Sequence, residues 1–482
     1  MIPVLMARPS TDRLDRRPEA VDGTASSGAR LHPEGPVTPV FTTMQRSIRL
    51  TCHHGRNLPS MPSVGLASSR PIESVQSSEK PVTNDRPIRI CRVIARINGG
   101  GTAVHLQNLG VNLDPNQFEQ VTLCGQVGPG EVDVSDDLRN AGLAVIQIDT
   151  LQRELRPLSD LVSLMRLITF FRKWKPDIVE THTAKAGTLG RLAALFAGVP
   201  VRLHVFHGHI FEGFFPPRKA RIFLEIERTL ARITTRIIAL GEHQRSDLLS
   251  RGIGKDHQVT SIPLGFNLDR FSSIPFESEL SGTGPLRREL GVESVEKALA
   301  PIVGMIARLV PTKAHEVFLE AAEIILRTIP GAQFVIVGDG ECRKKLEETA
   351  RTHPSGKRMH FLGWRTDTPE LYAEIDLIMH TSDSEGMPVA IIEALASGIP
   401  VVATAVGGVP DLIQDGINGH LVPPRNPQAT ANAVLSILTD PSKWAQMRCA
   451  ARKSVTPRHT VETLIANMTS LYKGLVPNPA AR

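Results

Sequence analysis

Short apolar runs alternate with amphipathic helical stretches in two series along this chain. The first series extends from Ile88 to about residue 251, and the second from Ile302 to about residue 453. Strands separated by helices of this length run parallel, because each helix returns the chain to the edge at which the previous strand began. The sequence therefore predicts an α/β fold with two Rossmann-like parallel-sheet domains that face each other across a cleft.

The same alternation predicts where the elements and domains begin and end. In the first series we expect strands at residues 88–95, 118–124, 144–148, 177–181, 201–206 and 236–240, with helices at 103–113, 158–173, 186–197, 217–233 and 242–251. In the second we expect strands at residues 302–307, 333–337, 359–362, 376–381, 401–404 and 420–422, with helices at 313–328, 340–350, 388–397, 426–437, 441–453 and 461–473. The chain divides into an extension at residues 1–86, domains at 87–265 and 266–456, and a C-terminal helix and tail at 457–482. The extension is rich in Ser, Pro, Arg and Gly, so we expect it to be disordered.

The segment from Ser382 to Pro410 predicts a ligand site. It reads as a strand end, a loop of small residues, a helix whose first residue is Pro388, and a further strand. A helix N-terminus at the carboxyl end of a parallel strand favours phosphate, and Gly386 allows a ligand to approach the backbone. Glu385 and Glu393 would repel phosphate, but carboxylates accept hydrogen bonds from sugar hydroxyls. A nucleotide-sugar, with a diphosphate between two polyols, satisfies both demands, although either glutamate alone is better explained as a surface charge.

Two further groups belong near such a site. Gly99, Gly100 and Gly101 follow the first predicted strand, where backbone amides can approach a phosphate, although a tight turn also explains them. The loop does not continue as G-x-G-x-x-G, which argues against a dinucleotide-dependent oxidoreductase. Arg308 and Lys313 flank the start of the helix after the first strand of the second series, and two cations there can neutralise a diphosphate leaving group. Alone, they would read as ordinary surface cations.

Several other classes of ligand are disfavoured. The net charge is +6 at pH 7, but aromatic residues make up only 4% and do not interleave with a basic run, so we expect no nucleic-acid partner. His204, His207 and His209 lie close together, but no neighbouring Cys or Asp completes a zinc site. The acidic residues at 133–137 are better explained as helix capping than as a D-x-D metal motif. We therefore expect neither a metal nor a cofactor.

The sequence also predicts the cellular compartment of the protein. The five cysteines are scattered and form no C-x-x-C pair, so a reducing cytoplasm is expected. No apolar stretch predicts a transmembrane span. Residues 216–238 predict a basic amphipathic helix, preceded by Phe211, Phe214 and Phe215, which either docks on anionic lipid or presents a solvated face. We expect a cytoplasmic protein, and the first alternative would place it at the inner face of the membrane as a peripheral membrane protein.

The two glutamates belong to a longer pattern. Glu385-Gly-Met-Pro through Glu393-Ala, followed by Gly398-Ile-Pro-Val-Val-Ala and Gly407-Gly-Val-Pro, resembles the E-x7-E signature of the large group 1 family of retaining glycosyltransferases with the GT-B fold. The resemblance implies a hexosyltransferase that moves a sugar from a UDP- or GDP-sugar donor to a glycan or polyprenyl-linked saccharide acceptor, in surface polysaccharide or glycoconjugate synthesis. It also implies that the anomeric configuration is retained and that the last helix crosses back to the first domain.

The resemblance assigns roles to individual residues. It implies that Arg308 and Lys313 grip the donor diphosphate and that His207 lies over the donor sugar. Glu385 would bind the hydroxyls of that sugar, and Glu393 would bind the ribose hydroxyls of the nucleotide. The other residues that we expect to bind the donor are Gly100, Gly101, Gly386, Met387, Pro388 and Val389.

Some features leave alternatives open. The chain departs from the family pattern at Ala307 and Ala314, where glycine is usual. His182 and Lys185, after the fourth strand, are candidates for contact with acceptor or donor. A nucleotide-sugar epimerase, a phosphorylase or a non-catalytic sugar-binding protein would share the fold. A non-catalytic sugar-binding protein would not keep the two cations that can neutralise a diphosphate, whereas this chain has both, Arg308 and Lys313.

Overall fold

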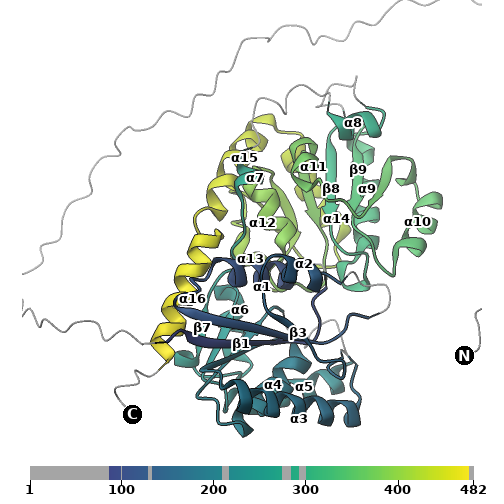
Figure 1. Ribbon diagram of the computed structural model, residues 1–482. Coiled ribbons are helices and arrows are strands. Elements are labelled where there is room, and N and C mark those ends of the chain that lie inside the picture. The colour runs from purple at the N-terminus through teal and green to yellow at the C-terminus, as the bar shows by residue number, and fades with distance from the viewer. Residues whose placement is uncertain are drawn as a thin grey trace, which may run out of the picture. The chain divides into compact units, whose positions relative to one another are not determined.

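The computed structural model describes residues 86–98, 100–128, 133–152, 154–208, 216–273, 284–292 and 300–476 (Figure 1). Within these residues the chain forms two parallel sheets covered by helices, which confirms the predicted fold class. The expected extension lies outside the described residues except for Arg86, which pairs with Asp177 at 2.8 Å and is therefore part of the folded domain. None of the described helices is long and apolar enough to cross a bilayer.

The first sheet has seven strands, namely β1 (Ile88–Ile94), β2 (Phe118–Cys124), β3 (Val145–Gln147), β4 (Ile178–His182), β5 (Val201–Phe206), β6 (Arg236–Ala239) and β7 (Val259–Ser261). Its helices are α1 (Gly101–Asn112), α2 (Ser135–Asn140), α3 (Pro157–Trp174), α4 (Ala184–Phe196), α5 (Pro217–Ala231) and α6 (Glu242–Ser250). The strand order is β3-β2-β1-β4-β5-β6-β7, and every pairing is parallel. The sequence did not predict β7, because its three residues, VTS, include a single apolar side chain and show no apolar run.

The second sheet has six strands, namely β8 (Ile302–Ile306), β9 (Gln333–Val337), β10 (Met359–Gly363), β11 (Leu377–His380), β12 (Val401–Thr404) and β13 (Gly419–Val422). The helices that accompany it are α7 (Asp269–Ser272), α8 (Pro285–Glu289), α9 (His315–Thr328), α10 (Arg343–Thr352), α11 (Thr368–Glu374), α12 (Val389–Ala396), α13 (Val409–Leu412), α14 (Pro427–Leu438) and α15 (Pro441–Val455). The strand order is β10-β9-β8-β11-β12-β13. The prediction that Pro388 is the first helical residue is wrong by one position: Pro388 is extended, with φ −73° and ψ 111°, and it caps α12.

Both sheets change their winding direction at one point. In the first sheet β1 lies between β2 and β4, and in the second β8 lies between β9 and β11. The loops that leave two neighbouring strands at such a point go to opposite faces of the sheet and leave a crevice, which is where open α/β sheets bind ligands. The topology therefore places the loops after β1, β4, β8 and β11 around two crevices.

The strands themselves are buried on both faces. All of β9 and β12 is buried, as is most of β1, and this agrees with their uninterrupted apolar sequences. Apolar side chains of both sheets and of α12 and α16 (Val461–Leu475) join in one buried cluster. This core fixes the strand ends, and with them the loops that form the site.

The last helix returns to the first sheet. α16 continues down the molecule from α15 and packs against α1 (Figure 1). The hydroxyl of Tyr472 on α16 donates a hydrogen bond of 2.5 Å to the buried carboxylate of Glu180 on β4. Arg92 on β1 donates to the same carboxylate at 3.2 Å, and the ring of Tyr472 packs edge-on against Phe118. Burial alone would raise the pKa of Glu180, but the contacts with His182, Arg92 and Tyr472 outweigh it and hold that pKa below its usual range.

Replacing Tyr472 with phenylalanine should therefore lower the free energy of unfolding by about 2 kcal/mol, because a buried carboxylate loses a charge-assisted hydrogen bond while the ring packing stays. Urea unfolding of the parent and of the Tyr472→Phe variant measures this difference. A change smaller than about 0.5 kcal/mol would show that the hydroxyl does not hold the crossing helix in place.

Candidate active site

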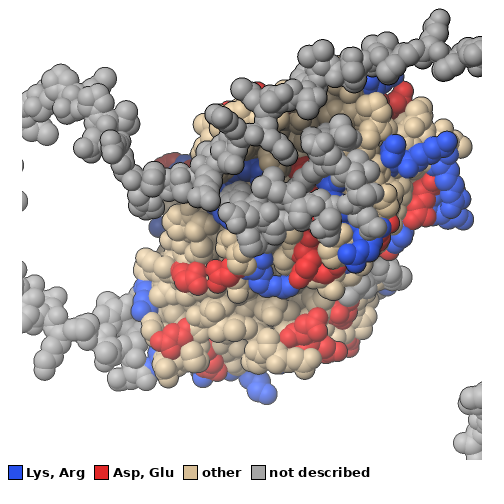
Figure 2. Space-filling model, turned by 90° about the horizontal axis from the view of Figure 1, so that it is seen from above, with Lys and Arg blue, Asp and Glu red and all other residues tan. Residues whose placement is uncertain are grey.

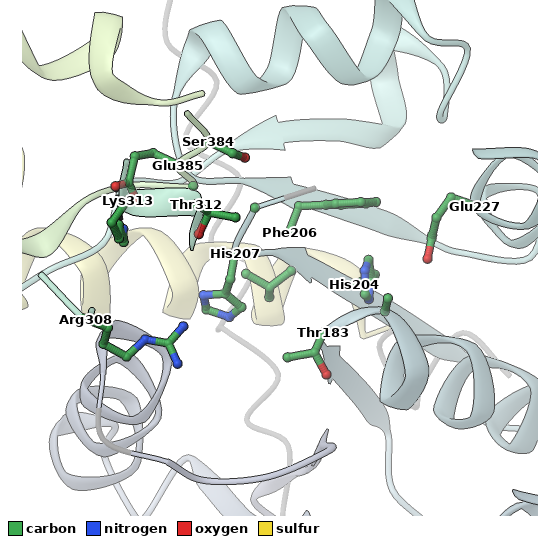
Figure 3. Close-up of a pocket in the computed structure, with 14 residues that line it drawn as sticks. Thr183, His204, Phe206, His207, Glu227, Arg308, Thr312, Lys313, Ser384 and Glu385 are labelled. Atoms are coloured by element: carbon green, nitrogen blue, oxygen red, sulfur yellow. Dashed lines mark hydrogen bonds and ion pairs between the residues drawn. The ribbon is translucent and has the colours of Figure 1, made fainter. Parts of the chain in front are cut away.

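A cavity of about 330 Å³ lies where the loops of the two sheets meet (Figure 3). Figure 3 shows Arg308 and Lys313 on one side of it, His207 near the middle and Glu227 on the other side. Both sheets contribute, through the loops after β4, β5, β8 and β11. The cavity is lined by Thr183, Ala184, His204, Val205, Phe206, His207, Gly208, Glu227, Arg308, Thr312, Lys313, Ser384, Glu385 and Gly386.

Lys313 and Glu385 form an ion pair on the wall of this cavity. The Nζ of Lys313 lies 2.5 Å from Oε1 of Glu385, and Nε2 of His380 contacts the same oxygen at 2.6 Å. The side chains of Lys313 and Glu385 are 17% and 7% exposed. Burial by itself would raise the pKa of Glu385, but the Lys313 ammonium and His380 outweigh it and hold that pKa below its ordinary value. Glu385 is therefore ionised at neutral pH and acts as a hydrogen-bond acceptor only.

Arg308 is positioned differently from Lys313. It follows β8, is exposed, and extends its guanidinium toward the part of the cavity where His207 lies (Figure 3). A guanidinium on an open cavity wall offers a planar set of donors that matches two phosphate oxygens. The cavity thus has one solvent-exposed cation and one cation that is already paired with a carboxylate.

The turn between these two cations and α9 is strained. A short 3₁₀ turn, Pro311–Lys313, is followed by Ala314 in the left-handed region, with φ 47° and ψ 48°. This region costs an L-residue with a Cβ atom roughly 1–2 kcal/mol and is readily occupied by glycine. The structure therefore gives a physical reason for the glycine that the family pattern usually has at Ala314.

Glycines allow the two domains to touch beside the cavity. A Cβ atom on Gly386 would lie 1.8 Å from the carbonyl oxygen of His207, and one on Gly208 would lie 3.3 Å from Cα of Gly386. A Cβ atom on Gly101 would lie 2.8 Å from a methyl group of Val389, so the start of α1 faces the start of α12. These positions need glycine because a neighbouring backbone or side chain fills the space.

Glu393 lies apart from the cavity. It is on α12, and its Oε2 accepts a hydrogen bond of 3.2 Å from the hydroxyl of Tyr372. Burial raises the pKa of Glu393 to about 7, and the Tyr372 hydrogen bond lowers it only in part. The structure thus brings Glu385 but not Glu393 to the cavity wall. The carboxyl group of Glu393 changes its protonation state near neutral pH.

Replacing Glu393 with glutamine should remove a pH dependence of stability. The ordinary pKa is 4.5 and the folded-state pKa is about 7, so the folded state binds the proton more tightly and stability falls as pH rises between these values. Near pH 4.5 the Glu393→Gln variant should have the same free energy of unfolding as the parent. At about pH 8 its free energy of unfolding should exceed that of the parent by about 2–3 kcal/mol. Urea unfolding at both pH values tests this, and a difference that stays constant with pH would refute it.

A chain of buried polar groups supports His207. Its Nε2 lies 2.9 Å from Nδ1 of His182, and Nε2 of His182 lies 3.1 Å from Oε1 of Glu180. His105 on α1 packs edge-on against both imidazoles. Burial, followed by the neighbouring histidines, lowers the pKa of His207 well below its ordinary value, so its imidazole is neutral. His105 and Glu180 were not predicted as site residues, because no local pattern in the sequence connects α1, β4 and the end of β5.

The three imidazoles also bear on metal binding. One nitrogen each of His105, His182 and His207 lies within 4.8 Å of the others, a spacing that could surround a metal ion. In the structure, Nδ1 of His182 and Nε2 of His207 are hydrogen-bonded to each other at 2.9 Å. The predicted cluster is different: His204 bonds Thr181 at 2.9 Å, and His209 lies outside the described residues. The absence of a metal stays a prediction.

The other predicted site residues are also placed. Gly100 precedes α1, Gly101 begins it, and Gly99 lies outside the described residues. Met387 is buried beside Pro388 at the start of α12, and neither residue lines the cavity. Lys185 does not line the cavity; it donates to the carbonyl of Glu154 and pairs with Asp160 on α3 at 2.5 Å. The cavity therefore brings together His207, Arg308, Lys313, Glu385 and Gly386, while the remaining predicted donor-binding residues lie around it.

Two facing Rossmann-like domains with a cavity at their switch points define a GT-B fold, the architecture of nucleotide-sugar glycosyltransferases. Family models match each half of the chain: "Glycosyl transferase 4-like domain" matches residues 100–265, and "Glycosyl transferases group 1" matches residues 289–454. The chain belongs to the group 1 glycosyltransferase family and is a glycosyltransferase. This confirms the family that the sequence resemblance indicated and favours it over an epimerase or a non-catalytic protein.

Named relatives and solved structures agree with this membership. The UDP-Gal:alpha-D-GlcNAc-diphosphoundecaprenol alpha-1,3-galactosyltransferase of Escherichia coli is 30% identical over 368 residues, which cover 76% of this chain and 91% of that protein. The N,N'-diacetylbacillosaminyl-diphospho-undecaprenol alpha-1,3-N-acetylgalactosaminyltransferase of Campylobacter jejuni is 26% identical, over 64% of this chain and 80% of that protein. The Anabaena protein Alr3699/HepE, solved with UDP and glucose, has the same fold, with a TM-score of 0.66, 24% identity, and coverage of 80% of this chain and 100% of that one.

Proposed function

We propose that this glycosyltransferase moves a hexosyl group from a UDP-sugar to a saccharide carried on a polyprenyl diphosphate, with retention of the anomeric configuration. The observation that carries the proposal is the cavity in which Arg308 and the Lys313–Glu385 pair face His207. Two relatives are named for acceptors that are saccharides on diphosphoundecaprenol, and one of these names also specifies a UDP-sugar donor. A cytoplasmic enzyme acting on such an acceptor would work at the inner face of the membrane.

In this proposal the cations act on the leaving group. The bond between the anomeric carbon and the diphosphate oxygen breaks with oxocarbenium character, so negative charge builds up on the departing UDP. Arg308 and Lys313, which line the cavity, would stabilise that charge, and the N-terminus of α12, which begins three residues after Gly386 of the cavity wall, would add its dipole. Lys313 would then share its ammonium between Glu385 and the diphosphate.

The neutral and acidic groups act on the sugar. Glu385, held in its ionised form, would accept hydrogen bonds from the hydroxyls of the transferred sugar. His207 is neutral and held by His182, so it can contact a sugar hydroxyl without adding a positive charge beside the forming oxocarbenium ion. Glu393, in the middle of α12, remains the candidate for the ribose hydroxyls.

The test is transfer by purified protein from a panel of UDP- and GDP-sugars to a short-chain polyprenyl diphosphate N-acetylhexosamine. We expect release of UDP that depends on the acceptor, and a product whose new linkage has the donor's anomeric configuration by NMR. A product with inverted configuration would exclude the retaining mechanism. Conversion of the donor into its epimer without an acceptor would instead support an epimerase.

A further inference from the structure

α3 has apolar side chains on two opposite faces. Its inner face, formed by Leu167, Ile168 and Phe171, is buried against the first sheet. On the opposite side are Leu158, Leu161, Val162 and Met165, which recur at the i, i+3, i+4, i+7 spacing of one helical stripe and are 83%, 57%, 44% and 55% exposed. We call these four residues the α3 outer face. A helix that is apolar on both sides needs a second apolar environment, and its outer face lacks one among the described residues.

The neighbouring helices also expose apolar side chains. α3, α4 and α5 lie side by side at the bottom of the view in Figure 1. Leu195 and Phe196 at the end of α4 are exposed, and so is Ile222 on α5. By contrast, much of the apolar face of α5, the helix for which the sequence left membrane docking and a solvated face as alternatives, packs against its own domain through Phe223 and Leu224. Phe211, Phe214 and Phe215 lie outside the described residues.

The charges on these helices are almost all positive. On α3, α4 and α5 the exposed basic residues are Arg166, Arg172, Lys173, Arg218, Lys219 and Arg221, and the only exposed acidic residue is Glu225. Arg166 and Lys173 line a shallow apolar groove together with Leu161, Val162 and Met165. On the face seen from above in Figure 2, by contrast, acidic and basic side chains are interspersed wherever grey residues do not cover them. The charge on the three helices therefore complements an anionic surface.

We propose that the α3 outer face docks on an anionic lipid bilayer, with Leu158, Leu161, Val162 and Met165 inserted among the acyl chains. Arg166 and Lys173 lie at the level of the lipid phosphates, the arrangement of an interfacial helix. The choice of a lipid bilayer as the partner rests on the proposed function, because the acceptor proposed there is lipid-linked.

The position of α3 relative to the cavity agrees with such docking. Lys185, in the first turn of α4, pairs with Asp160 of α3. The two residues before Lys185, Thr183 and Ala184, line the cavity. An ion pair therefore ties the apolar end of α3 to the cavity wall, so a bilayer under α3 would lie next to the site that receives the acceptor.

The test is flotation of the full chain with phosphatidylcholine vesicles that contain or lack phosphatidylglycerol. We expect the protein to float with the anionic vesicles. We expect the double variant Leu158→Gln with Leu161→Gln to lower its partition at least about tenfold, because two inserted apolar side chains are lost. Both side chains are exposed, so the free energy of unfolding should stay at the parent value. The pair Arg166→Gln with Lys173→Gln should weaken binding to the anionic vesicles and reduce its dependence on salt.

A matched control removes exposed apolar side chains elsewhere. Val111 and Ile417 are 52% and 55% exposed and lie outside α3, so Val111→Gln with Ile417→Gln should float as the parent does. The proposal is overturned if the α3 variant floats like the parent, or if the parent ignores phosphatidylglycerol. It is also overturned if the parent does not float but forms a dimer that the α3 variant dissolves, because the face is then a protein interface. An assay of sugar transfer to a water-soluble acceptor tests the enzymatic activity separately from membrane docking. If the protein floats with the vesicles as expected but transfers no sugar to any acceptor, the docking proposal stands and the proposed function is refuted.

Discussion

Replacing Arg308 with alanine is expected to lower turnover about 10²- to 10³-fold while the free energy of unfolding stays within about 0.5 kcal/mol of the parent. The side chain is exposed on the cavity wall, so its loss leaves no buried group without a partner. Its guanidinium would meet charge that develops on the diphosphate only as the sugar leaves, so the loss should fall mainly on kcat. Steady-state release of UDP and urea unfolding measure the two effects.

Two variants make this result specific. Arg308→Lys keeps the charge but loses the planar set of donors, so we expect an intermediate loss of about tenfold. Arg327 on α9 is 71% exposed and pairs only with Glu323 on the same helix among the contacts described here, so Arg327→Ala should leave turnover unchanged. Turnover of Arg308→Ala within about threefold of the parent would exclude Arg308 from the reaction.

Replacing Lys313 with methionine should reduce both turnover and stability. It would leave Glu385, 7% exposed, without its cation, and an unpaired buried carboxylate costs about 3 kcal/mol or more. The contact of 2.6 Å between His380 and the same carboxylate oxygen offsets part of that cost. We expect a loss of about 3 kcal/mol in the free energy of unfolding and at least a 10²-fold loss of turnover.

The double variant separates the two losses. Lys313→Met with Glu385→Gln removes the pair together and should recover most of the stability, because neither buried charge remains. Turnover should stay low, since both the cation and the sugar-binding carboxylate are gone. If the double variant were as unstable as Lys313→Met alone, the ion pair would not be what stabilises this wall of the cavity.

Periodicity was sufficient to predict both sheets, because parallel strands covered on both faces have apolar sequences that stand out from the helices between them. All the described strands longer than three residues were expected from the sequence, and only the edge strand β7 was not. The start of α12 was misplaced by one residue because proline is tolerated both at the N-cap and at the first helical position. The sequence alone does not decide which of the two positions Pro388 takes.

The candidate site was predicted only where its residues follow strand ends. Arg308, Lys313 and Glu385 lie in the loops after β8 and β11, so the fold class places them at the ligand-binding edge of one sheet, but the selection of the two cations as site residues depended on the family resemblance. The pairing of Lys313 with Glu385 depends on two loops far apart in the chain, and the sequence assigned the two residues separate roles. Buried partners such as Glu180 beneath His182 also depend on the register between strands, which one sequence does not reveal.

The most direct measurement is a structure of the protein with bound UDP. We expect the β-phosphate to lie in the cavity within about 3 Å of the Arg308 guanidinium and the Lys313 ammonium, near the N-terminus of α12. A diphosphate bound outside the cavity, with Lys313 still held by Glu385 and Arg308 remote from every phosphate oxygen, would contradict this expectation.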